Sequence, residues 1–154
     1  MEKSVRMLPE SLPACEFTPG NIKLRIDVSM AADIGSISPV VHGIMAMAGE
    51  IQTLSGKEME IETALREALA NAITHGCGSD PDKVIYCCVA LDETHGIIIV
   101  VRDPGNGYDP LAVPSPLVGE NIYSNHGRGI FLINQLIDEV HVRRNGTEIV
   151  MRKK

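Results

Sequence analysis

The chain has 154 residues, of which 44% are hydrophobic and 22% are charged, a composition typical of one folded domain rather than of a disordered chain. Its 14 Lys and Arg against 20 Asp and Glu give a formal net charge of −6, which argues against direct binding to nucleic acid. Three Tyr, two Phe and no Trp are too few aromatic residues to stack single-stranded bases.

Apolar runs and cysteines indicate the compartment. The longest uninterrupted apolar run, Val84–Leu91, is far shorter than the ~20 residues of a membrane-spanning helix, and the first residues do not resemble a signal peptide. Cys15, Cys77, Cys87 and Cys88 form no CxxC pair. We therefore expect a cytoplasmic protein with reduced cysteines, no zinc ribbon and no membrane contact.

The first fifty residues predict an arm, a strand and a helix. Residues 1–20 contain three prolines and no periodicity, which predicts a flexible arm or an extended edge. Alternating apolar residues at 22–28 predict a half-buried strand. A helix should follow up to about Ala48, either capped by Asp33 or starting later with Pro39 at its first position.

The middle of the chain predicts a long helix and two central strands. Helical periodicity covers residues 57–75, and Gly76 should end this helix in a left-handed conformation. The nearly all-apolar runs Val84–Leu91 and Ile97–Val101 are typical of strands buried in the middle of a sheet.

The last fifty residues predict a loop, a helix and a hairpin. Residues 103–126 contain four prolines and three glycines, and a connection of this length is typical of a functional lid or of disorder. A helix is predicted from about 129 to 137, then strands at 139–144 and 147–152 joined at Asn145-Gly146. This order predicts an α+β fold with helices on one face of a mixed sheet.

Three short motifs stand out from this pattern. In the long helix, Glu67, Asn71 and His75 follow at four-residue spacing and share one face, beside the apolar stripe. A carboxylate and an amide so placed suit a base and a metal ligand. Taken alone, however, such a row is typical of an ordinary solvated helix face.

The second motif is Asp103-Pro-Gly-Asn-Gly, directly after an apolar strand. A carboxylate at a strand end can accept a hydrogen bond from an exocyclic amine, and Gly105 and Gly107 let the backbone approach a ligand closely. The alternative is an ordinary turn. The third motif, Gly127-Arg128-Gly129, opens a helix, where free N–H groups bind phosphate. It has the spacing of neither the Walker loop nor the Rossmann fingerprint.

In this order the three motifs resemble the N, G1 and G2 boxes of the Bergerat-fold ATPases, the superfamily of gyrase, histidine kinases and MutL. The segments EALANAITHG, VVRDPGNGYDP and GRGIFLINQLIDEV resemble the anti-sigma factor serine/threonine kinases of bacteria. The resemblance runs from about Asn21 to the C-terminus. It implies a two-layer α/β sandwich with a mixed, mostly antiparallel sheet, a histidine-kinase-like ATPase domain at 21–154 after the arm at 1–20, and an ATP lid at about 109–126.

The resemblance also implies roles for single residues, with ATP and Mg²⁺ as cofactors. Asn71 would hold the Mg²⁺ that bridges the ATP phosphates. Glu67 would be the general base that takes the proton of a seryl or threonyl hydroxyl. Asp103 would accept a hydrogen bond from the adenine amine.

The remaining motif residues would complete the nucleotide site. Gly105 and Gly107 would shape its adenine and ribose side, and Gly127 and Gly129 would present N–H groups to the phosphates. Thr147 corresponds to a position near the adenine. The motifs also contain His75 and Arg128, which we assign to cofactor binding.

The resemblance implies a protein kinase that phosphorylates a STAS-type anti-anti-sigma protein and sequesters a sigma factor. Two alternatives are a nucleotide-dependent protein-binding switch without phosphotransfer and the ATPase module of a two-component histidine kinase. In the family, the first helix carries an Arg that meets the protein partner, but Ile34–Val41 contains no Arg or Lys. An exposed apolar face of this helix could pair two copies as a homodimer.

Overall fold

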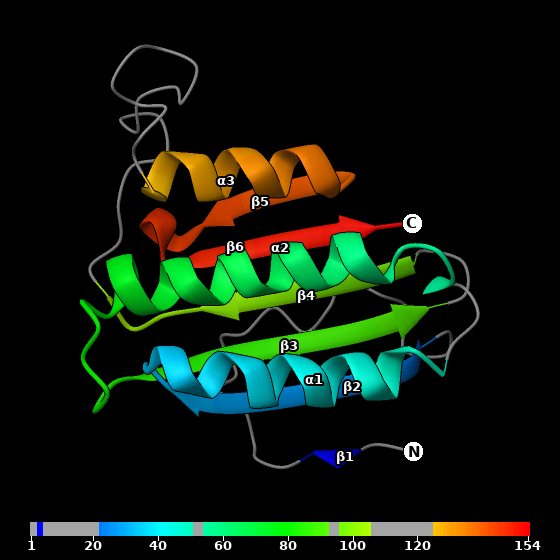
Figure 1. Cartoon of the computed structure of the whole chain (residues 1–154), viewed down its shortest axis with the longest axis horizontal. Coiled ribbons are helices and arrows are strands. Elements are labelled where there is room, and N and C mark those ends of the chain that lie inside the picture. Colours follow the sequence, from blue (N-terminus) through cyan, green and yellow to red (C-terminus); the bar gives the residue numbers. More distant parts are fainter. Residues whose placement is uncertain (1–2, 5–21, 51–53, 93–95, 106–124) are drawn as a thin grey trace.

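The computed structural model describes residues 3–4, 22–50, 54–92, 96–105 and 125–154, with the backbone alone at 3–4 and 125–128. In chain order (Figure 1), the strands and α-helices are β1 (Lys3–Ser4), β2 (Ile22–Ala31), α1 (Ile37–Ala48), α2 (Glu58–Asn71), β3 (Val84–Asp92), β4 (Gly96–Arg102), α3 (Asn125–Leu136), β5 (Glu139–Arg143) and β6 (Glu148–Lys153).

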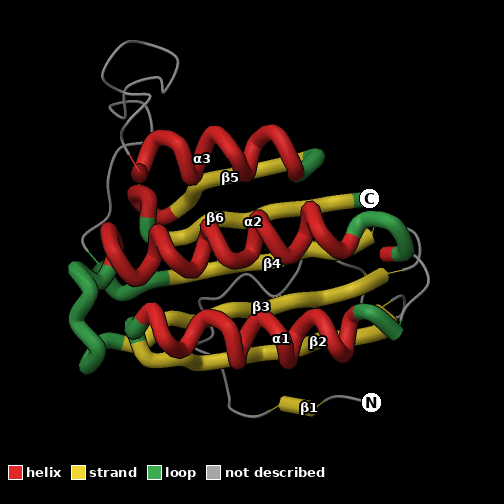
Figure 2. The backbone as a smooth tube through the Cα atoms, viewed as in Figure 1, coloured by secondary structure: helices red, strands yellow, loops and turns green. Residues whose placement is uncertain are grey.

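The strands form one six-stranded sheet in the order β1-β2-β3-β4-β6-β5. Neighbouring strands are antiparallel, except that β1 runs parallel to β2. Figure 2 shows the three α-helices side by side on one face of this sheet. The predicted α+β fold, a mixed and mostly antiparallel sheet with helices on one face, is confirmed.

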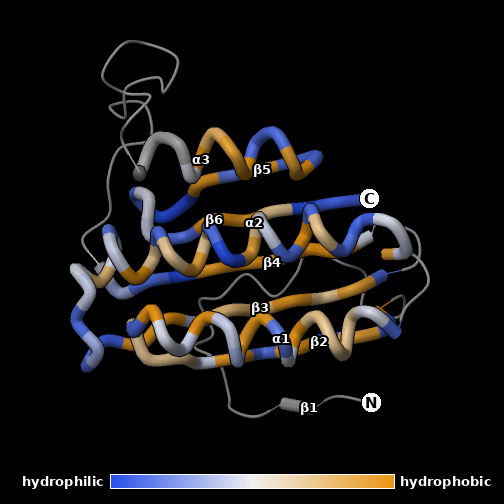
Figure 3. The backbone as a smooth tube through the Cα atoms, in the orientation of Figure 1, coloured by the Kyte–Doolittle hydropathy of each residue, from blue (hydrophilic) through white to orange (hydrophobic). Residues whose placement is uncertain are grey.

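The two apolar runs are the central strands, as predicted. β3 and β4 lie in the middle of the sheet, and Figure 3 shows them as its most hydrophobic part. Successive side chains point to opposite faces. Cys87 accordingly belongs to the core under the helices, and Cys88 to a separate cluster on the other face. Of the four cysteines, Cys77, Cys87 and Cys88 are free thiols, and Cys15 lies outside the described residues.

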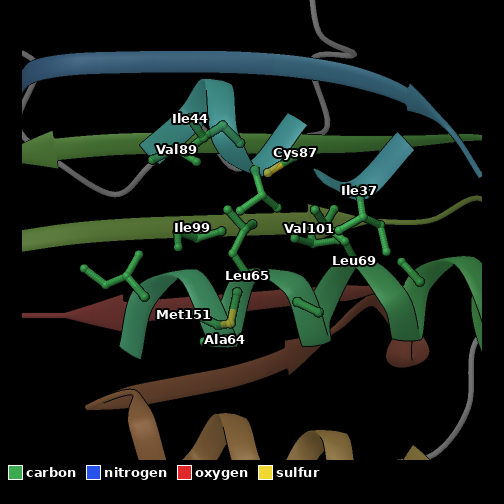
Figure 4. Packing of buried hydrophobic residues seen from close by; sticks show 14 of the residues in the cluster. Ile37, Ile44, Ala64, Leu65, Leu69, Cys87, Val89, Ile99, Val101 and Met151 are labelled. Carbon is green, nitrogen blue, oxygen red and sulfur yellow. The ribbon is translucent and has the colours of Figure 1, made fainter. Parts of the chain in front are cut away.

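The main core lies between the helices and the sheet (Figure 4). Leu65 and Leu69 of α2 are completely buried against the sheet, where Ile99 and Val101 of β4 face the helix layer. Burying one such side chain contributes about 1.5–3 kcal/mol. This packing fixes which face of α2 remains accessible. Among the described residues, no helix is long and apolar enough to cross a membrane.

The start of α1 has both predicted features, a cap at Asp33 and a proline in the first turn of the helix. Asp33 accepts a hydrogen bond from the Gly35 N–H at 3.2 Å and caps a 3-10 turn at Ile34–Ser36. The α-helix then begins at Ile37, which places Pro39 in its first turn. Proline is tolerated there because the first N–H groups of a helix have no intrahelical partner.

The long helix ends differently from the prediction. α2 stops at Asn71 and continues as a π-helical turn, Ala72–Gly76. Gly76 is not left-handed; Gly78 and Ser79 take positive φ angles of 59° and 58° instead. The π-helical turn continues through Gly76, so this glycine does not end the helix in a left-handed conformation as predicted. A glycine is needed there instead because of its close contact with Asp103.

Two further boundaries are corrected. α3 begins at Asn125 rather than near Gly129, because its packing against α2 outweighs the roughly 1 kcal/mol that each glycine costs in a helix. The hairpin is not a two-residue turn: Arg143 pairs with Glu148, and the residues between them form the connection. Thr147 belongs to this turn, because its N–H and its hydroxyl both donate to the Arg144 carbonyl, at 3.2 and 2.8 Å.

Candidate functional site

Four chain segments meet at one end of the molecule. The C-terminal end of α2, the end of β4, the start of α3 and the turn between β5 and β6 all lie at the left-hand side of Figure 1. Each of the three sequence motifs follows or opens one of these elements. The fold therefore brings together motifs that are up to sixty residues apart in the chain.

A cleft of about 580 Å³ lies between α2 and α3 at this end. Its lining consists of residues from the two helices and the π-helical turn: Glu67, Ala70, Asn71, Thr74, His75, Gly129, Phe131 and Leu132. Ligand pockets usually have volumes of about 300–1,000 Å³, so this cleft is large enough for a nucleotide-sized molecule.

The helical row forms one wall of the cleft. Glu67, Asn71 and His75 all line it, as their four-residue spacing indicates. Sequence reasoning missed Ala70 and Thr74, although each lies three residues after a member of the row and the same periodicity includes them. It also missed Phe131 and Leu132, whose positions in α3 carry no polar signal.

The side chain of Asn71, at the end of α2, packs directly against α3. A β-carbon at Gly129 would lie 2.8 Å from its Nδ2 atom and 3.0 Å from Oδ1, so α3 can approach this amide only because residue 129 is glycine. The Nδ2 atom is buried without a hydrogen-bond partner among the described residues. An orphaned amide at a cleft wall is costly unless a ligand or ion completes its contacts.

The start of α3 at Asn125 decides whether the N–H of Gly129 is free to bind a phosphate. In a helix that begins at Asn125, Gly129 lies in the second turn, where the N–H groups have intrahelical carbonyl partners. The free N–H groups therefore belong to the turn before it, which includes Gly127. The described contacts give Gly129 a packing function against Asn71.

Asp103 is held at the end of β4 by the backbone. Its N–H donates to the Thr147 carbonyl at 2.9 Å, which ties the strand end to the β5–β6 turn. Its Oδ1 atom accepts from the Gly105 N–H at 2.8 Å. Burial raises the pKa of this half-buried carboxyl, while the Gly105 N–H and the charge of Lys83 lower it.

Two glycines make room for this carboxylate. A β-carbon at Gly76 would lie 2.2 Å from the Asp103 Cγ atom, and one at Gly105 would lie 2.1 Å from the Gly76 carbonyl oxygen. Real β-carbons do not approach atoms so closely. The π-helical turn after α2 and the loop after β4 are thus in direct contact, which joins the Asp103 motif to the end of the helical row.

The surroundings of His75 and Cys77 determine the protonation states of these two side chains. Desolvation lowers the pKa of His75, which favours the neutral imidazole at pH 7. Burial and the Asp103 charge raise the pKa of the Cys77 thiol, which keeps it protonated. Neither Cys77 nor Lys83 was expected from the sequence to affect the site.

A guanidinium lies on the surface of α1, although α1 itself contains no Arg or Lys. Arg66 of α2 donates to the Ser38 hydroxyl at 3.0 Å and lies 3.3 Å from the His42 Nε2 atom. It also contacts Glu62 at 3.3 Å. The α1 surface therefore carries a cation that comes from the neighbouring helix.

Several predicted site residues cannot be placed. Gly107 and residues 109–124 of the expected lid lie outside the described residues, as does the arm apart from Lys3–Ser4. Gly127 and Arg128 lie in the first turn of α3, where only the backbone is described. Within the described part of the chain, no group of three or more His, Cys, Asp or Glu could hold a metal ion. A metal in the cleft would depend on Asn71 and on oxygens of a ligand.

Comparison with known proteins agrees with this geometry. Residues 30–153 match the family model described as the histidine kinase-like ATPase domain. The anti-sigma F factor of Priestia megaterium is 32% identical over 61% of this chain and 67% of its own. The anti-sigma F factors of Clostridium novyi and Clostridium perfringens are 27% and 29% identical, over 82% of this chain and 82% and 84% of theirs. A family match over most of the chain shows that this protein belongs to the histidine kinase-like ATPase domain family.

Proposed function

We propose that the protein is an ATP-dependent serine/threonine kinase that acts as an anti-sigma regulatory factor. The observation that carries the proposal is the shared cleft wall of Glu67 and Asn71, one helical turn apart, with Asp103 held at the same end of the molecule. The similarity to proteins named anti-sigma F factor supports the regulatory part.

Asp103 is suited to recognise adenine. Its half-buried carboxylate offers an acceptor oxygen, and the exocyclic amine of adenine is a donor. Guanine has a carbonyl oxygen at the same ring position, so it would face the carboxylate acceptor to acceptor. Gly105 and Gly107 would border the base and ribose, and the Thr147 carbonyl fixes the Asp103 backbone from the other side.

Asn71 fits a magnesium ion held together with nucleotide phosphates. Carboxamide oxygens are hard ligands of the kind Mg²⁺ takes, and Mg²⁺ is usually bound by one or two protein groups with phosphates and water. The orphaned Nδ2 atom is consistent with an amide whose proper partners come with the ligand. When bound, the ion would neutralise phosphate charge; Gly127 and Arg128 would add N–H groups and a positive charge.

Glu67 would act as the general base. It lines the cleft one turn before Asn71, so it can reach a hydroxyl held near the terminal phosphate. In the reaction, the hydroxyl oxygen forms a bond to the γ-phosphorus, the bond from that phosphorus to the bridging oxygen breaks, and ADP leaves. The hydroxyl proton passes to the Glu67 carboxylate. Positioning and charge neutralisation supply most of the rate in such transfers.

The proposed substrate is a serine or threonine of a STAS-type anti-anti-sigma protein, and the proposed second partner is a sigma factor. Arg66 supports a protein-binding role for the α1 surface, because it places a guanidinium next to Ser38 and His42. A cytoplasmic location follows from these partners.

The proposal is tested by transfer of labelled phosphate from Mg-ATP to a purified STAS-type protein encoded next to this chain. We expect labelled partner and ADP in equal amounts, together with calorimetric binding of both Mg-ATP and Mg-ADP. Binding of nucleotide without transfer to any such partner would favour a nucleotide-dependent switch. Absence of nucleotide binding would contradict the proposal altogether.

A further inference from the structure

A buried ion pair connects the two strands that end at the proposed adenine contact. Arg102 is the last residue of β4 and Glu148 is the first residue of β6, and the two stand opposite each other in the antiparallel pairing of these strands. The Arg102 Nε atom lies 3.8 Å from the Glu148 Oε2 atom, and the two residues are only 7% and 2% exposed. Because buried charges are costly, loss of either partner should disturb the strand ends.

The pair lies on the face of the sheet opposite the α-helices (Figure 2). Val101 belongs to the core under the helices, whereas Val100 and Val150 belong to the separate cluster on the other face. Successive side chains of a strand point to opposite faces. Arg102 and Glu148 are each two residues from a member of that separate cluster, so they share its face.

A backbone hydrogen bond links this pair to Asp103. The Asp103 N–H donates to the Thr147 carbonyl at 2.9 Å. That N–H belongs to the peptide unit that follows Arg102, and that carbonyl belongs to the peptide unit that precedes Glu148. The ion pair and the hydrogen bond therefore join the same two strand ends, and a change in the distance between Arg102 and Glu148 would move the backbone of Asp103.

Glu148 also stands opposite a second arginine. β6 lies between β4 and β5, and Glu148 pairs with Arg143 of β5 as well as with Arg102 of β4. Residues opposite each other in a sheet have their side chains on one face. Burial raises the pKa of the Glu148 carboxyl, and the charges of Arg144 and Arg143 lower it. Removing the charge of Glu148 would therefore strengthen the repulsion among these arginines at the strand ends.

We propose that Glu148 is a positioning residue of the nucleotide site: by holding Arg102 against β6, it keeps the Asp103 carboxylate where it meets the adenine amine. This inference rests on the proposed function of Asp103 in adenine recognition. A positioning role predicts that loss of the ion pair changes the choice between adenine and guanine. A loss of stability alone would weaken the binding of both nucleotides equally, because both bind the folded state.

The test is the ratio of ADP affinity to GDP affinity, measured by calorimetry on the whole chain. Glu148→Gln keeps the size of the side chain and removes its charge, and we expect the preference for ADP to fall by about tenfold. Glu139→Gln is the matched control. Glu139 pairs with Arg152 at 3.5 Å at the opposite end of the same two strands, so its loss should leave the preference unchanged.

Variants of Arg102 keep the proposal falsifiable in case Glu148→Gln does not fold. Arg102→Lys keeps a positive charge opposite Glu148 and should keep the preference for ADP, whereas Arg102→Met should lose it about as far as Glu148→Gln does. Cooperative thermal unfolding checks that each variant is folded.

Asp103→Asn separates failure of this inference from failure of the adenine contact. If Asp103→Asn loses the preference for ADP while folded Glu148→Gln and Arg102→Met keep it, the positioning role is overturned and the adenine contact stands. If Asp103→Asn also keeps the preference, the adenine contact itself is wrong, and the positioning role falls with it.

Discussion

Gly76 and Asp103 are packed so closely that only a glycine fits at position 76. A β-carbon there would lie 2.2–2.6 Å from the three carboxylate atoms of Asp103. The contact joins the end of the α2 row to the end of β4, so the geometry proposed for adenine recognition depends on a glycine at position 76.

Gly76→Ala should therefore weaken nucleotide binding by displacing Asp103. We expect ADP affinity to fall by about tenfold, the equivalent of one misplaced charge-assisted hydrogen bond, and the preference for ADP over GDP to shrink. Calorimetry with both nucleotides measures each effect. Gly43→Ala is the matched control, because a β-carbon in the middle of α1 meets nothing within 4 Å. Unchanged ADP affinity and selectivity in Gly76→Ala would show that Asp103 does not read the base.

Nucleotide binding should weaken on acidification at a higher pH than an ordinary aspartate would cause. Burial raises the pKa of Asp103, so its carboxylate takes up a proton earlier as the pH falls. The protonated form no longer accepts from the adenine amine. By linkage, this raised pKa also means that the folded state loses stability as the pH rises through it. ADP affinity measured from pH 7.5 down to 5 should decline in the wild type beyond the decline in Asp103→Asn. If ADP affinity declined equally with pH in the wild type and in Asp103→Asn, Asp103 would not be the titrating group.

Asn71→Ala should abolish most of the stabilisation that Mg-ATP gives. A ligand at a hundredfold excess over its dissociation constant stabilises the folded state by about 2.7 kcal/mol, and loss of the proposed metal ligand should remove most of this. Thermal unfolding with and without Mg-ATP measures it. Asn134→Ala is the control, since that exposed amide donates to the Ile130 carbonyl within α3 and lies outside the cleft lining. An equal Mg-ATP shift in Asn71→Ala and wild type would refute the metal assignment.

The core under α2 should dominate stability. Leu65 is completely buried between α2 and the sheet, so Leu65→Ala should lower the free energy of unfolding by about 2–5 kcal/mol through lost burial and a cavity. Met59 of the same helix is 80% exposed, and Met59→Ala should change stability by less than about 0.5 kcal/mol. Denaturant titration compares the two. Similar losses in both variants would contradict the packing described for α2.

The sequence predicted those parts of the fold that local periodicity determines. β3 and β4 read as uninterrupted apolar runs, and the row from Glu67 to His75 follows from helical spacing alone. The start of α3 could not be predicted, because Gly127 and Gly129 are poor helix formers, and only the packing of Gly129 against Asn71 shows why a glycine stands at position 129. Likewise, Gly76 looks like a helix terminator in the sequence, and its true requirement comes from Asp103, a residue distant in the chain.

Contacts between distant residues also explain what sequence reasoning missed at the site. Arg66 reads as the partner of Glu62 within one helix, yet it also reaches Ser38 and His42 on α1. The sequence predicts Thr147 as the first residue of a strand. In the structure Thr147 lies in a turn, and its carbonyl accepts a hydrogen bond from the Asp103 N–H. Both roles depend on how the elements pack, which no local pattern records.

The general-base role of Glu67 is the central claim, and Glu67→Gln tests it most directly. The amide keeps the size and hydrogen bonding of the side chain but cannot take the proton, and a positioned base typically contributes about 10²–10⁴-fold to a rate. Labelled-phosphate transfer from Mg-ATP to the STAS-type partner is measured with nucleotide affinity in parallel. Glu58→Gln is the matched control, a carboxylate in the first turn of the same helix and outside the cleft lining. We predict that Glu67→Gln binds Mg-ATP like wild type and loses transfer by at least about a hundredfold, while Glu58→Gln retains it; full transfer by Glu67→Gln would contradict the account.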